Sequence, residues 1–343
     1  MRRQRGEEVD MGWRSIVLPA LICLSIVLFG VDVLFGSVDV PLSDFIGLFN
    51  GQCSPIHRTI LVDIRIPKAI TSVLVGLSLS VSGLWMQTLF RNPLVGPYVL
   101  GISSGASLGV AIFILLFSFL GISAVYVSSW GIVLSALAGA FSIFLLVIIV
   151  SFKLRDNVSL LIAGIMFGCL ATAAISLLQN ISDPDSVKMF VNWTLGSVSG
   201  VTWEKLRIMS VFVCIGVTMV PWLLKPLDAL LLGDDYANSV GVNVKHVRWW
   251  IILSATILTG ATTAFTGPIG FIGIAVPHIA KGLLRTSVHY KLTPCCMLCG
   301  AVLMLTCDIL SQLPESGYVL PINALSSLLG APIVLWILLG GRK

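Results

Sequence analysis

Long runs of hydrophobic residues follow one another along this chain, and charged residues are confined to the short segments between them. The clearest run lies between Asn92 and Phe152, where no Asp, Glu, Lys or Arg occurs. A helix rises about 1.5 Å per residue, so about 20 apolar residues span the hydrocarbon core of a bilayer. This stretch is long enough for two crossings. The pattern therefore predicts an all-α polytopic membrane protein.

Apolar runs that end at turn or charge signals predict about ten transmembrane helices. Their expected ranges are Ile16–Phe35, Ala69–Phe90, Leu100–Leu120, Val127–Val150, Leu160–Leu178, Ile208–Leu224, Trp249–Phe265, Ile269–Ala280, Pro294–Leu310 and Leu325–Leu339. The eighth is short and contains Pro277, which predicts a broken or kinked helix. Eight or nine spans are compatible with the same pattern. No connector is long enough for a soluble domain, so residues 1–343 are expected to form one transmembrane domain.

The distribution of charge predicts the orientation. An even number of spans places both termini on one side, and with that side inside, the inner segments carry fifteen Lys and Arg residues against six outside. Because basic residues are concentrated in cytoplasmic loops, both termini are expected in the cytoplasm. The composition agrees, with 57% hydrophobic and 11% charged residues. The net charge of +5 comes from scattered bases and does not indicate nucleic-acid binding.

Signatures of catalysis and of metal binding are missing from the sequence. It contains no G-x-x-x-x-G-K-[ST], H-E-x-x-H or G-x-S-x-G, so ATP binding and enzymatic activity are not expected of this chain. Cys296 and Cys299 have C-x-x-C spacing but lie in an apolar run without a second pair, which favours packing. His278 is interpreted as a hydrogen-bonded structural group. Asp308, the one acid well within an expected span, is interpreted in the same way, and no metal site is expected.

The segment between the second and third expected helices combines a turn rich in Pro and Gly, Asn92–Pro97, with regularly spaced glycines. Gly101, Gly105 and Gly109 fall on one helix face and allow a neighbouring backbone to approach closely. This pattern predicts close helix packing whatever the protein does.

Five motifs follow one another across nearly the whole chain. They are Arg65-Ile66-Pro67-Lys68 with Gly76, Ser82-Gly83 and Gln87; Asn92-Pro93-Leu94-Val95-Gly96-Pro97 with Leu100-Gly101-Ile102-Ser103-Ser104-Gly105-Ala106; Trp193-Thr194-Leu195-Gly196-Ser197 with Trp203; Gly267-Pro268-Ile269-Gly270-Phe271-Ile272-Gly273 with Pro277-His278; and Leu329-Gly330-Ala331-Pro332 before Trp336. In this order they resemble the FecCD-type permeases of ABC importers for iron-siderophore, haem and cobalamin.

The resemblance implies a type II ABC importer permease fold with ten helices, in the bacterial inner membrane. It implies pairing with a second permease subunit, often a copy of the same chain, with two cytoplasmic ATPase subunits that bind the ATP, and with an extracytoplasmic binding protein. No cofactor is then expected in this chain. The implied substrate is a metal chelate, an iron-siderophore or haem, with cobalamin as the alternative. The sequence does not encode which chelate passes.

The resemblance also assigns a coupling role to the inner segment between the sixth and seventh expected helices, about residues 225–248. The residues that it implies contact the ATPase are Gly233, Asp234, Asp235, Tyr236, Ala237, Ser239 and Gly241. Acids near the start and bases near the end of this segment suit the dipole of a short helix. The alternative interpretation is a solvated loop.

Two further roles follow from the resemblance, each with an alternative. Arg65 and Lys68 match a pair that docks the binding protein, although bases at a membrane interface also snorkel to anchor a helix. Lys68 replaces a frequent Arg, and Gln312 falls where some members have another docking Arg. Asn157, Val158 and Ser159 match the pathway and cytoplasmic gate, although small polar residues at a helix start also act as N-caps.

Two other classes of protein are alternatives to this family. An ion-coupled secondary transporter or a channel would share the helix count but should place charges near the middle of the membrane or form a filter. An intramembrane enzyme would need a constellation of His, Asp or Ser that the sequence does not contain.

Overall fold

The computed structural model describes residues 2–36, 38, 40–51, 53–119, 128–154, 156–312 and 319–340, and these ranges contain helices and no strand. In chain order, the helices of the first part of the chain are α1 (Arg2–Leu34), α2 (Leu42–Asn50), α3 (Pro55–Thr59), η1 (Ile60–Arg65), α4 (Ile66–Leu89), η2 (Pro97–Leu100), α5 (Ile102–Ala111), η3 (Ile112–Leu116), α6 (Phe117–Phe119) and α7 (Ser129–Lys153). Those that follow are α8 (Asn157–Ile181), α9 (Pro184–Thr194), α10 (Trp203–Thr218), α11 (Val220–Leu231), α12 (Asp234–Ser239), α13 (Val244–Thr266), α14 (Ile272–Leu284), α15 (His289–Ser311) and α16 (Ile322–Gly340).

Each of the ten expected spans coincides with a helix or with consecutive helices, and the all-helical membrane fold is confirmed. Among the described residues, six helices are long and apolar enough to cross a membrane alone. The consecutive helices α10 and α11, bent by 46°, would make a seventh. The apolar segments Ile102–Leu116, Ile272–Leu284 and Ile322–Leu335 are shorter. The count of ten crossings therefore stays a prediction.

The outer connectors fold into helices that the hydrophobic pattern did not predict. α3, η1 and α4 are consecutive, so this helical stretch starts at Pro55, well before the expected Ala69. Its start is fixed locally, because the Ser54 hydroxyl accepts a hydrogen bond from the His57 amide at 3.2 Å and Pro55 occupies the first turn. Helix boundaries set by caps rather than by apolar residues are invisible to hydropathy.

The eighth expected span is displaced along the chain. It was predicted at Ile269–Ala280, but α14 runs from Ile272 to Leu284 and is preceded by non-helical backbone. Gly267 and Phe271 have positive φ values of 74° and 64°, and such conformations cannot continue a right-handed helix. Pro277 lies inside α14 without ending it.

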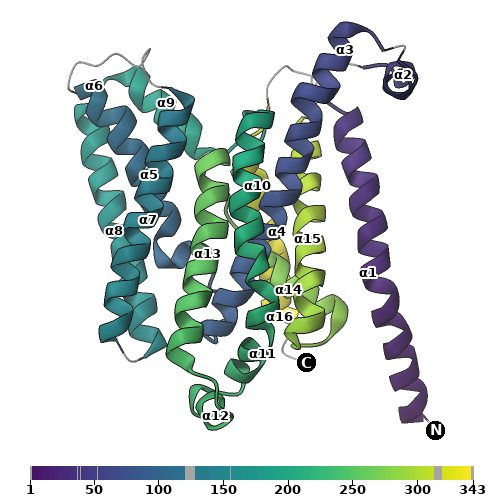
Figure 1. The fold of residues 1–343 in the computed structure, drawn as a ribbon, viewed down its shortest axis with the longest axis vertical. Helices are drawn as coiled ribbons and strands as arrows, with labels where there is room; N and C mark the ends of the chain where they lie inside the picture. Colours follow the sequence, from purple (N-terminus) through teal and green to yellow (C-terminus); the bar gives the residue numbers. More distant parts are fainter. Residues whose placement is uncertain are drawn as a thin grey trace.

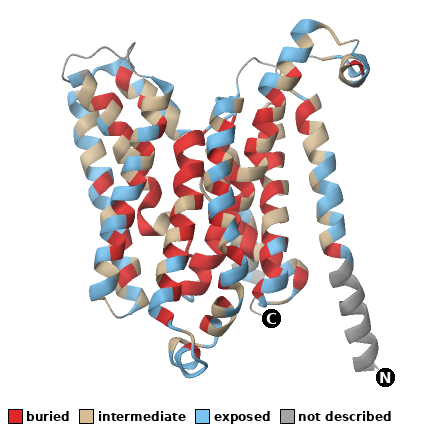
Figure 2. Ribbon diagram, in the orientation of Figure 1, coloured by how far each residue is buried: buried red, intermediate tan, exposed pale blue. Residues whose placement is uncertain are grey.

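The centre of the bundle consists of α4 and α13, with α15 packed along α4 (Figures 1 and 2). Glycines set these distances: a Cβ on Gly76 would lie 2.2 Å from the Gly300 carbonyl oxygen, and one on Gly83 would lie 1.9 Å from that of Gly273. Several buried hydroxyls of α4 and α13 bond within their own helices, as Ser82 does to the Ser78 carbonyl at 2.8 Å. Such bonds satisfy polar groups where no water is present.

The helices at the edges of the bundle are less buried than those at its centre. α8 lies at one edge and α1 at the other (Figure 1), and only Leu160, Gly164 and Ala171 are buried along α8. α1 and α16 both reach the end of the bundle where α12 lies, as expected when both chain ends are on one side (Figure 1). That end is called the inner end below, and the end near α3 is called the outer end.

Candidate coupling and transport site

The short helix α12 is fastened to the inner ends of α4 and α13 by one carboxylate. Arg91 follows α4, donates its Nε–H to the Leu230 carbonyl at 3.2 Å and donates from Nη2 to Asp234 Oδ1. Arg248 on α13 places Nη2 3.7 Å from Asp234 Oδ2. Asp234 also lies in the first turn of α12, where a negative charge is favoured by the helix dipole. The prediction of a short helix in this segment is confirmed.

The residues expected to contact an ATPase divide into two groups. Asp234 is held by the two arginines, Ala237 is fully buried, and Gly233, with φ of 125°, forms the turn into α12. Asp235, Tyr236, Ser239 and Gly241 are exposed, and Tyr236 is 46% accessible. The first group positions the helix and the second forms its free surface. Contact with an ATPase stays a prediction for the second group.

A second inner connection was missed by the sequence analysis. The carboxylate of Asp228, on α11, accepts hydrogen bonds from the His289 amide at 2.9 Å and contacts His289 Nδ1 at 2.6 Å. The other ring nitrogen lies 2.9 Å from the Thr88 hydroxyl, and the imidazole is buried. α11 is thus joined to α15 and α4. No sequence signal links these residues, because they are far apart in the chain and form no motif.

The residues around His278 have structural roles. His278 Nδ1 donates to the Ile274 carbonyl at 2.8 Å, and Gln87 Nε2 donates to the same carbonyl at 3.3 Å. Lys281 in turn donates to Gln87 Oε1 at 3.3 Å. The interpretation of His278 as a hydrogen-bonded structural group is confirmed. Within the described ranges, no cluster of three His, Cys, Asp or Glu residues could hold a metal ion.

The residues proposed as a gate lie where α8 begins. Asp156, which the sequence analysis missed, is the N-cap: it accepts a hydrogen bond from the Ser159 amide at 2.7 Å, and this bond lowers the pKa of its carboxyl. Asn157 donates from Nδ2 to the Leu89 carbonyl at 2.8 Å and so ties α8 to the end of α4. Val158 is 64% exposed. The capping alternative therefore applies to Asp156, and a gating role of the three predicted residues stays a prediction.

The motif between α4 and α5 packs as its glycines predict. The Asn92 side chain accepts a hydrogen bond from the Leu94 amide at 3.0 Å, and Gly101 takes a positive φ of 75° before α5. A Cβ on Gly105 would lie 2.6 Å from the Gly139 carbonyl oxygen of α7. Ser103 lies 3.4 Å from the Thr263 hydroxyl of α13.

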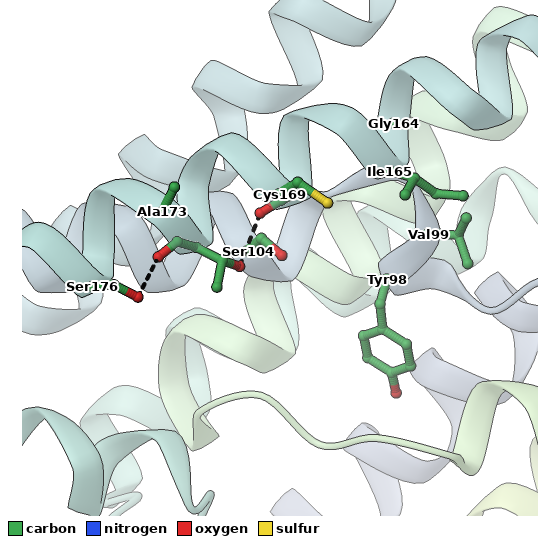
Figure 3. A pocket seen from close by; sticks show the side chains of 10 residues that line it. Tyr98, Val99, Ser104, Gly164, Ile165, Cys169, Ala173 and Ser176 are labelled. Carbon is green, nitrogen blue, oxygen red and sulfur yellow. Dashed lines mark hydrogen bonds between the residues drawn. The ribbon is translucent and has the colours of Figure 1, made fainter.

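A groove of about 620 Å³ runs along α8 where this helix meets η2 and α5 (Figure 3). Its lining is mostly apolar and includes no charged residue; the lining residues are Tyr98, Val99, Ser104, Gly164, Ile165, Gly168, Cys169, Thr172, Ala173 and Ser176. The Thr172 and Ser176 hydroxyls donate to carbonyls one turn earlier, at 2.9 and 3.0 Å. The groove can therefore accommodate a solute without binding it through charge.

The structure contradicts the exposed positions expected of Arg65 and Lys68 at the outer end. Their accessibilities are 4% and 3%. Arg65 donates to the carbonyls of Val33 and Leu34, at 3.1 and 2.6 Å, and to that of Val38. Its guanidinium therefore satisfies carbonyl oxygens at the end of α1, which have no partner within the helix. Docking of a binding protein by these two residues stays a prediction, as does anchoring at the membrane interface.

Lys68 is paired with acids of its own chain. Its Nζ lies 3.2 Å from Asp32 Oδ1 and 3.3 Å from Asp308 Oδ2, and the Ser72 hydroxyl donates to Asp308 at 2.9 Å. Asp308 is hydrogen-bonded, as expected, and a structural role for it stays a prediction. Asp32 lies within the first expected span, Ile16–Phe35, but it was missed because its partners lie on other helices.

Comparisons with known proteins agree with this geometry. Residues 22–340 match the model of the FecCD transport family. The chain is 36% identical to the haemin transport system permease HmuU of Yersinia pestis, over 86% of this chain and 88% of HmuU. It is 33% identical to the vitamin B12 import system permease BtuC of Vibrio cholerae, over 83% of this chain and 84% of BtuC.

Among solved structures, an inward-facing metal-chelate type ABC transporter matches with a TM-score of 0.82 and 30% identity, over 95% of this chain and 99% of that one. The match therefore extends over the central helices, the coupling segment and α8 together. With the family model covering most of its length, this chain belongs to the FecCD transport family.

Proposed function

We propose that this chain is the transmembrane permease subunit of an ATP-driven ABC importer that moves a metal chelate from the outer side to the cytoplasm. The observation that carries the proposal is α12, a short helix with an exposed face that is braced from behind by Arg91 and Arg248. A braced helix can pass a displacement to α4 and α13, whereas a solvated loop would absorb it. Family membership supports this interpretation.

The energy source and the other subunits belong to this proposal. The sequence contains no ATP-binding loop, so ATP is bound by two cytoplasmic ATPase subunits and no cofactor resides in this chain. A second permease, in the simplest case another copy, covers the exposed face of α8, and an extracytoplasmic binding protein delivers the solute. The complex resides in a bacterial inner membrane.

The groove along α8 is the proposed pathway wall. Its uncharged lining suits a chelate whose metal is already enclosed by organic ligands, because such a solute needs weak contacts rather than a metal site. Iron-siderophore or haem is the proposed substrate, supported by the likeness to HmuU, and cobalamin is the alternative, supported by the likeness to BtuC.

An ion-coupled secondary transporter remains the candidate from another class, because the buried acids Asp32 and Asp308 are the kind of group that such carriers use. Their location at the outer end, around a lysine, suits a structural role better. The two functions differ in their need for ATP.

The test is uptake by vesicles that contain the chain with its ATPase, with the binding protein and labelled ferric siderophore, haem or cobalamin outside. ATP-dependent uptake of one chelate, and copurification of the ATPase, are expected. Tyr236→Ala should abolish ATP-driven uptake while leaving the folded protein intact, whereas the matched change Asn238→Ala on the same helix should be milder. Uptake driven by an ion gradient without ATP would overturn the proposal.

A further inference from the structure

A second pocket lies toward the inner end of the bundle, where the chain bends by 46° between α10 and α11 (Figure 1). Its volume is about 580 Å³, and its walls come from both of these helices and from the start of α13. The lining residues are Thr218, Met219, Trp222, Leu223, Pro226, Val247 and Trp250. This site is called the elbow pocket, and it shares no lining residue with the groove along α8.

Two prolines shape the bend beside the elbow pocket. Pro221 stands in the first turn of α11, where a missing N–H is tolerated, and the amide of Met219 donates to the Val217 carbonyl instead. Pro226 lies inside α11 and cannot donate to the carbonyl of Trp222, four residues earlier. The sequence itself therefore turns α11 away from the direction of α10.

The lining of the elbow pocket is apolar and aromatic. The Thr218 hydroxyl already donates to the Ile215 carbonyl at 2.8 Å. Trp222 and Trp250 come from different helices and are 82% and 43% accessible, and Trp249 packs edge-on against Trp250 with ring centroids 4.6 Å apart. Indoles combine an apolar ring with a polar N–H and are typical of the membrane–water interface. Such a lining fits a hydrocarbon chain that reaches the interface.

The elbow pocket is continuous with an exposed apolar stripe of α10. Val211 and Ile215 are exposed and precede Thr218 by seven and by three residues, so the three side chains lie along one helix face. α10 and α11 together are long and apolar enough to cross a membrane. A stripe of this kind on a membrane-spanning helix faces lipid, which places the mouth of the pocket at the lipid surface.

Exposed bases lie next to the two tryptophans of the elbow pocket. Lys225 follows Trp222 by three residues on α11, and His246 precedes Trp250 by four on α13, so each is a neighbour of a tryptophan on its helix surface. Lys245 is exposed in the same turn as His246. Basic groups beside an apolar site at a membrane interface attract the headgroups of anionic lipids.

The acids nearest to these bases in the chain are engaged with other partners. Asp228 of α11 contacts His289, and Asp234 of α12 is held by Arg91 and Arg248. Asp235 lies on the exposed surface of α12. The positive charge at the elbow pocket is therefore available to an external anion.

We propose that the elbow pocket binds an anionic phospholipid from the membrane leaflet at the inner end. One acyl chain fills the apolar pocket, and the phosphate lies near Lys225 and Lys245, at the level where the tryptophans meet water. The proposal rests on the membrane fold and on these side chains, and it does not depend on which solute the protein transports.

Quenching of tryptophan fluorescence by brominated lipids tests the proposal, because bromine quenches indoles that the labelled acyl chain touches. The full chain is reconstituted in phosphatidylcholine vesicles that contain a small, fixed share of brominated phosphatidylglycerol or, in a parallel sample, of brominated phosphatidylcholine. We expect stronger quenching by the anionic lipid, and this excess should be lost in the double variant Trp222→Phe/Trp250→Phe. Equal quenching of the wild-type chain by both lipids would overturn the proposal.

Substitution of the lysines keeps both reporter tryptophans and tests the role of charge. One lysine at a membrane surface contributes about a fivefold preference for anionic lipid, so Lys225→Gln should lower the excess quenching, and Lys225→Gln/Lys245→Gln should remove it. Lys153→Gln is the matched control, because Lys153 is an exposed lysine at the end of α7, which contributes no residue to the elbow pocket. This control should keep the excess.

Three results would show that the site is something else. Excess quenching that survives in the double lysine variant would mean that charge does not select the lipid. Excess quenching that survives without Trp222 and Trp250 would place the anionic lipid at another site. Excess quenching that disappears when an ATPase subunit is bound would assign the elbow pocket to that protein. Each of these results would overturn the proposal.

Discussion

The two ends of α4 carry similar ion pairs in opposite surroundings. At the outer end, Lys68 bridges Asp32 and Asp308, and these three side chains, called the outer cluster, are at most 4% accessible. At the inner end, Arg91 and Asp234 pair while 43% and 34% of their side chains are accessible. The chemistry is the same, a base of the α4 region binding an aspartate of another segment, but only the inner pair is open to water and salt.

The difference shows which contacts can change during a working cycle. Breaking a buried ion pair costs much stability, because it leaves charges that water cannot reach. Breaking an exposed ion pair costs little stability, because water then solvates both charges. The buried ion pairs at the outer end therefore hold their helices more firmly than the partly exposed pair at the inner end does. α4 lies between them as the common element, and its glycine contacts make it rigid.

The largest expected effect is at the buried end. Lys68→Met should lower the free energy of unfolding by about 3–5 kcal/mol, because it leaves two buried acids without their ammonium. Thermal or denaturant unfolding of the purified chain in detergent measures this loss. Adding Asp32→Asn to Lys68→Met should recover part of it, since one of the two acids is then removed.

Lys188→Met is the control for this variant, because Lys188 is an exposed lysine on α9. It should change stability by no more than about 0.5 kcal/mol. Equal effects of the two substitutions would mean that the outer cluster is no more stabilising than a surface charge, and the comparison would fail.

A loss of stability of intermediate size is expected from a substitution between the two ends of α4. Gly83→Ala should cost roughly 1–3 kcal/mol, because the new Cβ would lie 1.9 Å from the Gly273 carbonyl oxygen and α4 must move away from α14. Gly282→Ala is the matched control, since a Cβ there meets no atom within 4 Å. Unfolding measurements on both variants decide; a loss of equal size in both would show that close contact along α4 is unimportant.

The smallest effect on stability is expected at the inner end. Asp234→Asn should cost at most about 1 kcal/mol, because the pair is partly exposed and the amide still accepts from Arg91. The loss should shrink further as salt rises, since salt screens exposed charges. Unfolding in low and in high salt measures the loss of stability and its dependence on salt. A salt-independent loss of several kcal/mol would place this pair in the same class as the outer cluster.

The hydrophobic pattern predicted the central helices well, for physical reasons. A run such as Ala69–Phe90 must be helical in a membrane because no other structure satisfies its backbone, and α4 covers nearly that range. The glycine stripe from Gly101 to Gly109 predicted close packing, and Gly105 and Gly109 lie against α7 while Gly101 lies against α8. The coupling segment was located through its family motif, and its helix is present as α12.

The side-chain environments could not be predicted in the same way. Lys68 was assigned to the outer surface through its family motif, but its burial depends on Asp32 and Asp308 in helices far away in sequence. The same is true of Thr88 and His289, whose contact joins distant segments. Helix starts fixed by Ser54 and Asp156 are local, yet hydropathy does not register caps.

The outer cluster has a consequence for how the chain is made. Ribosomal synthesis delivers α1 and α4 early, so Asp32 and Lys68 can enter the bilayer as a neutral pair while most of the chain is still missing. Asp308 emerges near the end and brings a second acid to a site that is already balanced. The ion pairs that join α1, α4 and α15 are therefore complete only when the late helix α15 has been inserted.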